Sequence, residues 1–248
     1  MDIKILVVTH KPYWMPEDKI YLPIQVGFGE DLGFQRDNTG DNISGKNKNY
    51  CELTALYWTW KNLDADYIGL AHYRRHFSLN KKHDKHLAPV TEADIVPLLA
   101  NGDVLLPKKR HYYIETTYSQ YIHAHHKEDL DTTEAILKEK YPDYLDTYKE
   151  VMGKTSGHRF NMFIMKKDIF DEYCKWLFGI LFELESRLDI SDYSTNDARV
   201  VGFVGERLLD VWILKNNIVY KDIPYVFMEK QNWVKKGSAF LKRKINHG

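Results

Sequence analysis

The sequence predicts a single α/β domain around a mostly parallel, Rossmann-like central sheet, and three observations carry this prediction. Short, continuous apolar runs at 3–9, 67–71 and 104–106 have the composition of strands that are buried on both faces. Helical periodicity lies between and after these runs, most clearly in the apolar stripe from Phe170 to Leu188. The intervening segments are long enough for the crossovers that connect parallel strands.

In the first half of the chain, a second strand is expected at 21–27. The segment 29–49 is rich in Gly, Asn and Asp, which indicates a long irregular loop, and loops of this length are more often functional than idle. A helix should then extend to about Leu63. Asn49 and Glu52 have the spacing of a capping box at its start.

Further along the chain we expect helices at 92–100 and within 117–152, a strand at 159–165, and a long helix capped by Asp168. A last helix is predicted from Gly205 to Asn216, which places Glu206 in its first turn. The chain ends in basic residues. We therefore expect one domain at 1–235 and a basic tail at 236–248.

Composition and charge narrow the class of protein. The 35 basic residues balance the 35 acidic ones, which argues against a general nucleic-acid-binding protein. Cys51 and Cys174 stand far apart and form no metal or disulfide pattern, so a reducing compartment is expected. The apolar run near the N-terminus is too short for a signal peptide or a membrane span. These features predict a cytoplasmic protein.

Basic residues follow three of the predicted strands: Thr9-His10-Lys11, His72 to His76, and Lys108-Lys109-Arg110. Ligands of parallel sheets bind outside the carboxyl ends of the strands. A site lined by Arg, Lys and His suggests an anionic ligand such as a phosphate or diphosphate. The alternative is that Arg74 and Arg75 pair with buried carboxylates and only tie loops together.

Familiar phosphate and metal motifs do not occur at this predicted edge. The sequence has neither a G-x-x-x-x-G-K-[ST] loop nor G-x-G-x-x-G. Asp64-Ala65-Asp66 has the Asp-x-Asp spelling that holds Mg²⁺ or Mn²⁺ on a diphosphate, but it precedes its strand, so we interpret it as a turn. Cations in His72-Tyr73-Arg74-Arg75 would then neutralise the charge on a departing diphosphate in place of a metal ion.

Two further features contain candidate site residues. His123 and His126 share a face of the predicted helix while His125 points away, and no acidic residue has the spacing of a metal ligand. We interpret them as a partly exposed polar face, with substrate contact as the alternative. Glu206 follows two glycines, where backbone can approach a ligand, and is a candidate acid-base residue. Its alternative role is a favourable interaction with the helix dipole.

Four long segments resemble, in the same order, a bacterial family found in capsular and exopolysaccharide gene clusters. They are GDNISGKNKNYCELTALYWTWKNL, DYIGLAHYRRHF, FNMFIMKKDIFDEYCKWLFGILFELE and RVVGFVGERLLDVW. The family was long filed as a domain of unknown function and is now regarded as glycosyltransferases. The resemblance implies a GT-A-like fold, a nucleotide-sugar donor such as UDP-galactose or UDP-galactofuranose, and a saccharide or lipid-linked acceptor.

The resemblance also implies roles for individual residues. RFNMFIM is similar to the FNxG strand of other GT-A enzymes, which points to Asn161, although Met162 and Phe163 stand where the glycine would fall. Glu206 would correspond to the carboxylate that serves as base in inverting GT-A enzymes. Some metal-independent members of that fold use basic residues in place of Asp-x-Asp, as the residues from His72 to Arg75 suggest here.

Together these observations give the hypothesis of an inverting glycosyltransferase that needs no metal cofactor. Three sets of residues are expected to form its site. Glu206, Arg74 and Arg75 would be catalytic. The donor would be bound by Thr9, His10, Lys11, Asn38, Asp41, Asn47, His72 and Tyr73. The acceptor would be bound by His123, His126, Arg159 and Asn161.

Two rival functions remain open at this stage. One is a transferase of the same fold that depends on Mg²⁺ or Mn²⁺ held by carboxylates scattered in the sequence. The other is a non-catalytic nucleotide- or carbohydrate-binding protein that uses its aromatic residues for stacking. Separately, basic and apolar residues alternate near the C-terminus, a pattern compatible with peripheral contact at the inner face of the cell membrane. A solvated terminus is the alternative.

Overall fold

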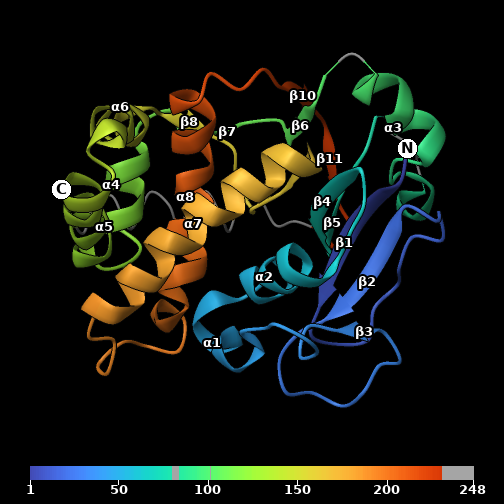
Figure 1. Cartoon of the computed structure of the whole chain (residues 1–248), viewed down its shortest axis with the longest axis horizontal. Coiled ribbons are helices and arrows are strands. Elements are labelled where there is room, and N and C mark those ends of the chain that lie inside the picture. Colours follow the sequence, from blue (N-terminus) through green and yellow to red (C-terminus); the bar gives the residue numbers. More distant parts are fainter. Residues whose placement is uncertain (80–83, 101, 231–248) are drawn as a thin grey trace.

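The computed structural model describes residues 1–79, 84–100 and 102–230. The predicted boundary at 235 and the basic tail at 236–248 lie outside the described residues. The predicted α/β architecture with a mostly parallel central sheet is confirmed: one large sheet lies between helices (Figure 1). No helix of the described part combines the length and the apolar character needed to cross a membrane.

The main sheet has seven strands in a continuous path, in the order β10-β6-β9-β4-β1-β2-β3. They are β1 (Ile3–Thr9), β2 (Tyr21–Gln25), β3 (Gln35–Arg36), β4 (Tyr67–His72), β6 (Val104–Pro107), β9 (Phe163–Lys166) and β10 (Lys221–Ile223). Strand β9 runs antiparallel to both of its neighbours, and the other pairs on the path are parallel. The start of β9 therefore lies at the same edge as the carboxyl ends of the parallel strands.

Strand β4 continues into a hairpin that the sequence did not predict. The chain reverses at Tyr73 and Arg74 and returns as β5 (Arg75–Phe77), antiparallel to β4. Strand β11 (Tyr225–Phe227) pairs antiparallel with β5 on its other side. The basic residues after β4 are thus part of ordered sheet structure. A separate small sheet joins β7 (Arg110–His111) to β8 (Ser156–Gly157).

Eight α-helices are seen in the described residues: α1 (Asn47–Tyr50), α2 (Leu53–Asn62), α3 (Glu92–Leu99), α4 (Thr117–Ile122), α5 (Lys127–Lys140), α6 (Leu145–Gly153), α7 (Lys167–Arg187) and α8 (Val200–Lys215). Short 3₁₀ turns lie at Ser44–Lys46, Lys85–Leu87, Pro142–Tyr144 and Asp197–Arg199. Figure 1 shows α2 and α7 across one face of the sheet, with α4, α5 and α6 on the far side of α8.

The alternation of side chains along the strands divides the core into two parts. In β1, Leu6 and Val8 join the large cluster under α2, α7 and α8. Ile3, Ile5 and Val7 point the other way, into the smaller cluster that includes residues of α3. Both faces of the strand are buried, which is why its sequence reads as an unbroken apolar run.

Several predicted boundaries are wrong. The last helix begins at Val200, so Glu206 is in its second turn and not its first. Asn49 and Glu52 form no capping box, because α1 ends at Tyr50 and the chain turns at Cys51 with a φ of 53°. The loop expected at 29–49 contains β3, a 3₁₀ turn and the first three residues of α1.

Three other local predictions also need correction. The strand placed at 159–165 is limited to 163–166, since Phe160 and Asn161 have φ values of 78° and 54°. Asp168 is inside α7, which begins at Lys167. His123 and His126 share no helix face, because α4 ends at Ile122 and His126 precedes α5.

The packing of α7 generates a stability prediction. Leu177 is fully buried in the large core cluster, so the Leu177→Ala variant should lose about 2 to 5 kcal/mol of unfolding free energy through lost burial and the remaining cavity. Urea denaturation would measure it. The matched Leu87→Ala change removes a side chain that is 62% exposed and should alter stability by less than about 0.5 kcal/mol. Equal losses in both variants would contradict this view of the core.

The hairpin generates a second prediction, which concerns pH. His76 in β5 is fully buried beside the rings of Trp14 and Tyr21, and this burial lowers its pKa from 6.5 to about 4. The unfolded chain therefore takes up this proton first as the pH falls, and stability is lost below about pH 6.5. Lowering the pH from 7.5 to 5 should cost about 2 kcal/mol through His76.

The His76→Phe variant keeps an aromatic ring in this pocket and cannot titrate. Its urea-unfolding free energy should therefore fall by about 2 kcal/mol less than that of the unchanged protein over the same pH interval. Identical pH dependence in the two proteins would show that His76 does not fold as a neutral ring.

Candidate active site

The carboxyl edge of the sheet brings together three polar segments that lie far apart in the sequence. Val8 in β1 pairs with His72 in β4, and Leu70 in β4 pairs with Phe163 at the start of β9. The residues that follow β1, those that follow β4 and those that precede β9 must therefore be neighbours. This is the edge at which α/β sheets bind ligands.

Two carboxylates face this edge: Glu206 from α8, and Glu52, which directly precedes α2. Glu52 accepts a hydrogen bond from Asn161 Nδ2 at 2.7 Å, and its Oε1 lies 4.0 Å from His72 Nε2. Glu206 Oε1 lies 3.9 Å from Arg159 Nε and 3.3 Å from Arg207 Nη1. Both carboxylates are close enough to Arg75 and His72 to influence the pKa of each.

His72 is a neutral donor in this arrangement. Its Nε2 lies 2.5 Å from the carbonyl oxygen of Phe160, and a carbonyl can only accept, so Nε2 carries the proton. Burial lowers the pKa of His72; Glu52 opposes that shift and Arg75 adds to it. The ring therefore holds the loop before β9 against the end of β4.

Arg159 fixes the position next to Glu206. Its side chain is 1% exposed and donates to the hydroxyl of Tyr112 at 2.8 Å and to that of Thr117 at 3.0 Å. It also lies 3.4 Å from Asp210, one turn after Glu206 in α8. A buried guanidinium with this many partners cannot move without breaking several of them.

His158 anchors the same loop from the other side. Its ring is buried between two carboxylates, with Nδ1 2.5 Å from Asp210 and Nε2 2.9 Å from Asp222 in β10. Its backbone N–H also donates to Asp210. The start of β9 is thereby held to both α8 and β10.

The arginines of the hairpin are placed differently from each other. Arg75 lies over the ring of Phe160, 4.2 Å from its centre, and 5.5 Å from that of Phe227. Within the described residues no carboxylate lies within ion-pair distance of it. Arg74 lies over Tyr73 and pairs with Glu229 at 3.8 Å, where both side chains are partly exposed. Neither arginine is paired with a buried carboxylate of the described chain.

A further group of cations surrounds His10 after β1. Burial lowers the pKa of His10, and the charges of Lys11, Arg74 and Arg199 add to this shift. Lys11 lies over the ring of Tyr73, 5.3 Å from its centre. The hairpin and the end of β1 therefore share one basic neighbourhood.

The structure leaves several predicted site residues outside this neighbourhood. Asn38 is exposed in the loop after β3. Asp41 bonds to Tyr57 and Asn62, and Asn62 is the last residue of α2, at the end opposite Glu52. Asn47 donates to the carbonyl of Cys51 and lies nearer the edge.

The remaining candidates have local partners. Thr9 is buried, and its hydroxyl bonds to the backbone of Lys11. His123 contacts Glu115 at 2.5 Å, and the ring of His126 stacks on Tyr193. These histidines lie between α4 and α5. The binding roles of all these residues remain predictions.

Sequence reasoning missed Glu52 and Arg199. Glu52 was assigned to a helix cap, although its side chain makes no such bond. Arg199 precedes α8 and donates to Cys51 Sγ at 3.1 Å. The one feature of the sequence that could have indicated them is that each of these charged residues lies just before an apolar helix.

The acidic residues of the Asp-x-Asp sequence do not fit a metal site at this edge. Asp64 and Asp66 precede β4, at the opposite end of the sheet, and Asp66 accepts a hydrogen bond from the backbone of Asp2 at 2.7 Å. The described residues also contain no group of three or more His, Cys, Asp or Glu side chains arranged to hold a metal ion.

Comparisons with known proteins agree with this fold. The structure is similar to the apo structure of WbbM, a bifunctional glycosyltransferase, with a TM-score of 0.85 and 33% sequence identity. The match covers 93% of this chain and 46% of that chain, so this chain spans about half the length of WbbM. No curated protein matches the chain. A family model described as "Domain of unknown function (DUF4422)" matches residues 4–217, and the chain therefore belongs to that family.

Proposed function

We propose that this protein is a glycosyltransferase that moves a hexose from a UDP-sugar to a saccharide or lipid-linked acceptor. One observation carries the proposal: at the carboxyl edge, Glu206 lies beside a fixed arginine and close to Arg75, a cation that has no carboxylate partner among the described residues. The fold similarity to WbbM, which is described as a bifunctional glycosyltransferase, supports the same class of reaction.

The basic neighbourhood would receive the diphosphate of the donor. Arginine and lysine match the geometry and charge of phosphate oxygens, and Arg75 has no carboxylate partner in the described chain to compete with a ligand. The charges of Lys11, Arg74 and Arg199 all act on His10 and lower its pKa, so these three cations lie close to one another. Thr9, Asn47 and Tyr73 would contact the donor next to these cations. The loop that contains Asn38 and Asp41 is further away and would have to extend toward the nucleotide.

Glu206 would act as the general base of an inverting transfer. It takes the proton of the acceptor hydroxyl while that oxygen forms a bond to the anomeric carbon of the donor. The bond from the anomeric carbon to the β-phosphate oxygen breaks at the same time, and its electron pair leaves with UDP. Arg74 and Arg75 stabilise the negative charge that develops on the leaving diphosphate.

Glu52 and Asn161 would position the sugar. Their mutual hydrogen bond and their closeness to His72 give three polar groups in one fixed arrangement at the centre of the edge. We propose galactose or galactofuranose as the transferred sugar and capsule or exopolysaccharide synthesis as the process. Both proposals come from the resemblance of four sequence segments to the family found in capsular and exopolysaccharide gene clusters. His123 and His126 would contact only a longer acceptor from their place between α4 and α5.

A non-catalytic nucleotide- or carbohydrate-binding protein is the competing function. Incubation with a panel of UDP-sugars and saccharide acceptors, with UDP release as the readout, separates the two. UDP release that depends on the acceptor supports transfer. Donor binding without any UDP release would support the competing function.

Replacing the proposed base is the most direct test of the mechanism. The Glu206→Gln variant keeps the shape and loses the proton acceptor, so kcat should fall by about 10² or more. Steady-state UDP release would measure it. The matched Glu172→Gln variant changes an exposed residue of α7 and should keep normal turnover. Near-normal activity of Glu206→Gln would remove Glu206 from this role.

The role given to fixed cations predicts independence from divalent metals. Turnover should stay within about twofold of its initial value after dialysis against EDTA and assay in excess chelator, because Arg74 and Arg75 supply the charge that a metal ion would otherwise supply. Turnover that disappears with EDTA and returns with Mn²⁺ or Mg²⁺ would support the metal-dependent alternative.

A further inference from the structure

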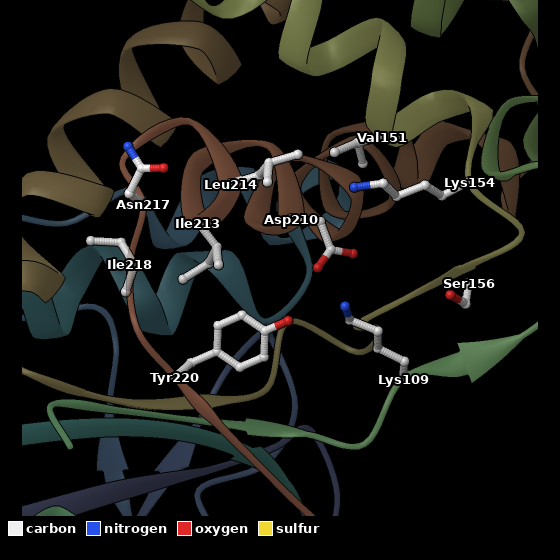
Figure 2. Close-up of a pocket in the computed structure, with 10 residues that line it drawn as sticks. All are labelled: Lys109, Val151, Lys154, Ser156, Asp210, Ile213, Leu214, Asn217, Ile218 and Tyr220. Carbon is white, nitrogen blue, oxygen red and sulfur yellow. The ribbon is translucent and has the colours of Figure 1, made fainter. Parts of the chain in front are cut away.

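A cavity lies one helical turn beyond Glu206 and borders the candidate site at Asp210. It has a volume of about 270 Å³ and lies between α6, α8, the strand β8 and the segments that precede β7 and follow α8 (Figure 2). Its lining residues are Lys109, Val151, Lys154, Ser156, Asp210, Ile213, Leu214, Asn217, Ile218 and Tyr220. The volume suits one ring-sized ligand and is below that of a usual drug-sized pocket.

The cavity shares a wall with the candidate active site. Asp210 lines it and also lies 3.4 Å from Arg159, which in turn lies 3.9 Å from Glu206. Glu206 and Asp210 are four residues apart in α8, so they lie on one face about 6 Å apart along the helix axis. That distance is comparable to the length of a single sugar ring.

The chemistry of the lining is that of a neutral sugar site. Figure 2 shows the Lys109 ammonium beside the Tyr220 hydroxyl and below the Asp210 carboxylate, so donors and an acceptor meet on one side. Ile213 and Ile218 form an apolar wall against them. Sugars present hydroxyl groups at their rim and C–H groups on their faces, which matches both kinds of surface.

Charge favours a neutral ligand over an anion. Lys154 pairs with Glu150 at 2.7 Å, and Lys109 interacts with Tyr220, Asp210 and Asp222. Burial opposes protonation of Lys109, but these partners leave its pKa raised overall. The positive charges of the cavity are therefore already balanced by carboxylates of the chain.

We infer that this cavity binds a neutral hexose unit of the acceptor, adjacent to the unit whose hydroxyl reacts at Glu206. The inference rests on the proposed function, and it makes the preferred acceptor a chain of at least two sugar units. The cavity would select acceptors by length and hold the reacting unit in register with Glu206.

Direct binding tests the cavity without any need for turnover. The probes are methyl β-galactoside, methyl β-glucoside and methyl α-mannoside, with glucuronate and inorganic phosphate as anionic comparisons, all followed by ligand-observed NMR. Leu214→Trp fills the cavity from its partly exposed rim, and Val219→Trp places the same ring on an exposed neighbour outside the lining. Thermal unfolding of both variants reports whether they fold.

At least one neutral hexoside should bind with a Kd of about 1 to 10 mM, and Leu214→Trp should weaken it about tenfold or more while Val219→Trp leaves it unchanged. The Lys109→Gln variant removes a charged donor without filling the cavity and should also weaken hexoside binding. It serves as the test if Leu214→Trp does not fold. The inference is overturned if no neutral hexoside binds, if only the anionic probes bind, or if the folded cavity variants bind as the unchanged protein does.

Kinetics then connects the cavity to transfer. With an active donor, a two-unit acceptor should have a KM about tenfold lower than its one-unit analogue, and Leu214→Trp should abolish that difference with kcat on the one-unit acceptor unchanged. A length preference that survives in Leu214→Trp would contradict the inference. Hexoside binding in the cavity without any transfer would instead contradict the proposed function and leave the binding site in place.

Discussion

The buried guanidinium of Arg159 is the constraint on which the candidate site depends. Its partners come from the segment before α4, from α4 itself and from α8: Tyr112, Thr117 and Asp210. An unpaired charge at this depth would be very costly, so all of these elements must keep their relative positions. Glu206 is held at one side of this charge and the cavity wall at the other. A single buried cation therefore sets the spacing between the proposed base, Glu206, and the cavity proposed to bind a hexose of the acceptor.

The loop before β9 contains Arg159 and has a strained backbone. Phe160 and Asn161 both have positive φ values, which are unfavourable for residues other than glycine. The strain persists because side chains hold the loop on both sides: His158 between Asp210 and Asp222, and Asn161 on Glu52. Strained segments that are fixed so thoroughly are common at functional sites, because the fixed geometry is what the site needs.

Much of the fold could be predicted from the sequence, because apolar runs and helical stripes report burial directly. The direction of β9 could not, since a short apolar strand looks the same in either direction. The helix α8 was predicted to begin at Gly205 but begins at Val200, so Gly202 and Gly205 both lie inside it. Both glycines are contact points: a β-carbon at Gly205 would lie 2.8 Å from Leu53, and one at Gly202 would lie 3.3 Å from Cys51. Close approach of helices is a tertiary requirement that periodicity does not show.

The same limit applies to the residues that meet at the candidate site. Basic residues after β1 and β4 were found through the rule that ligands bind at the carboxyl edge, whereas Glu52 and Arg199 reach that edge only through the packing of α2 and α8. The structure adds a physical reason why a cation could be useful there. Arg75 lies over the rings of Phe160 and Phe227. Burial, followed by the charge of Arg74, lowers the pKa of Arg75, which means that its charge is poorly stabilised in the folded chain. An anionic group placed beside it would supply that missing stabilisation, and because the hairpin is already paired to β11, the cation would need little rearrangement to receive it.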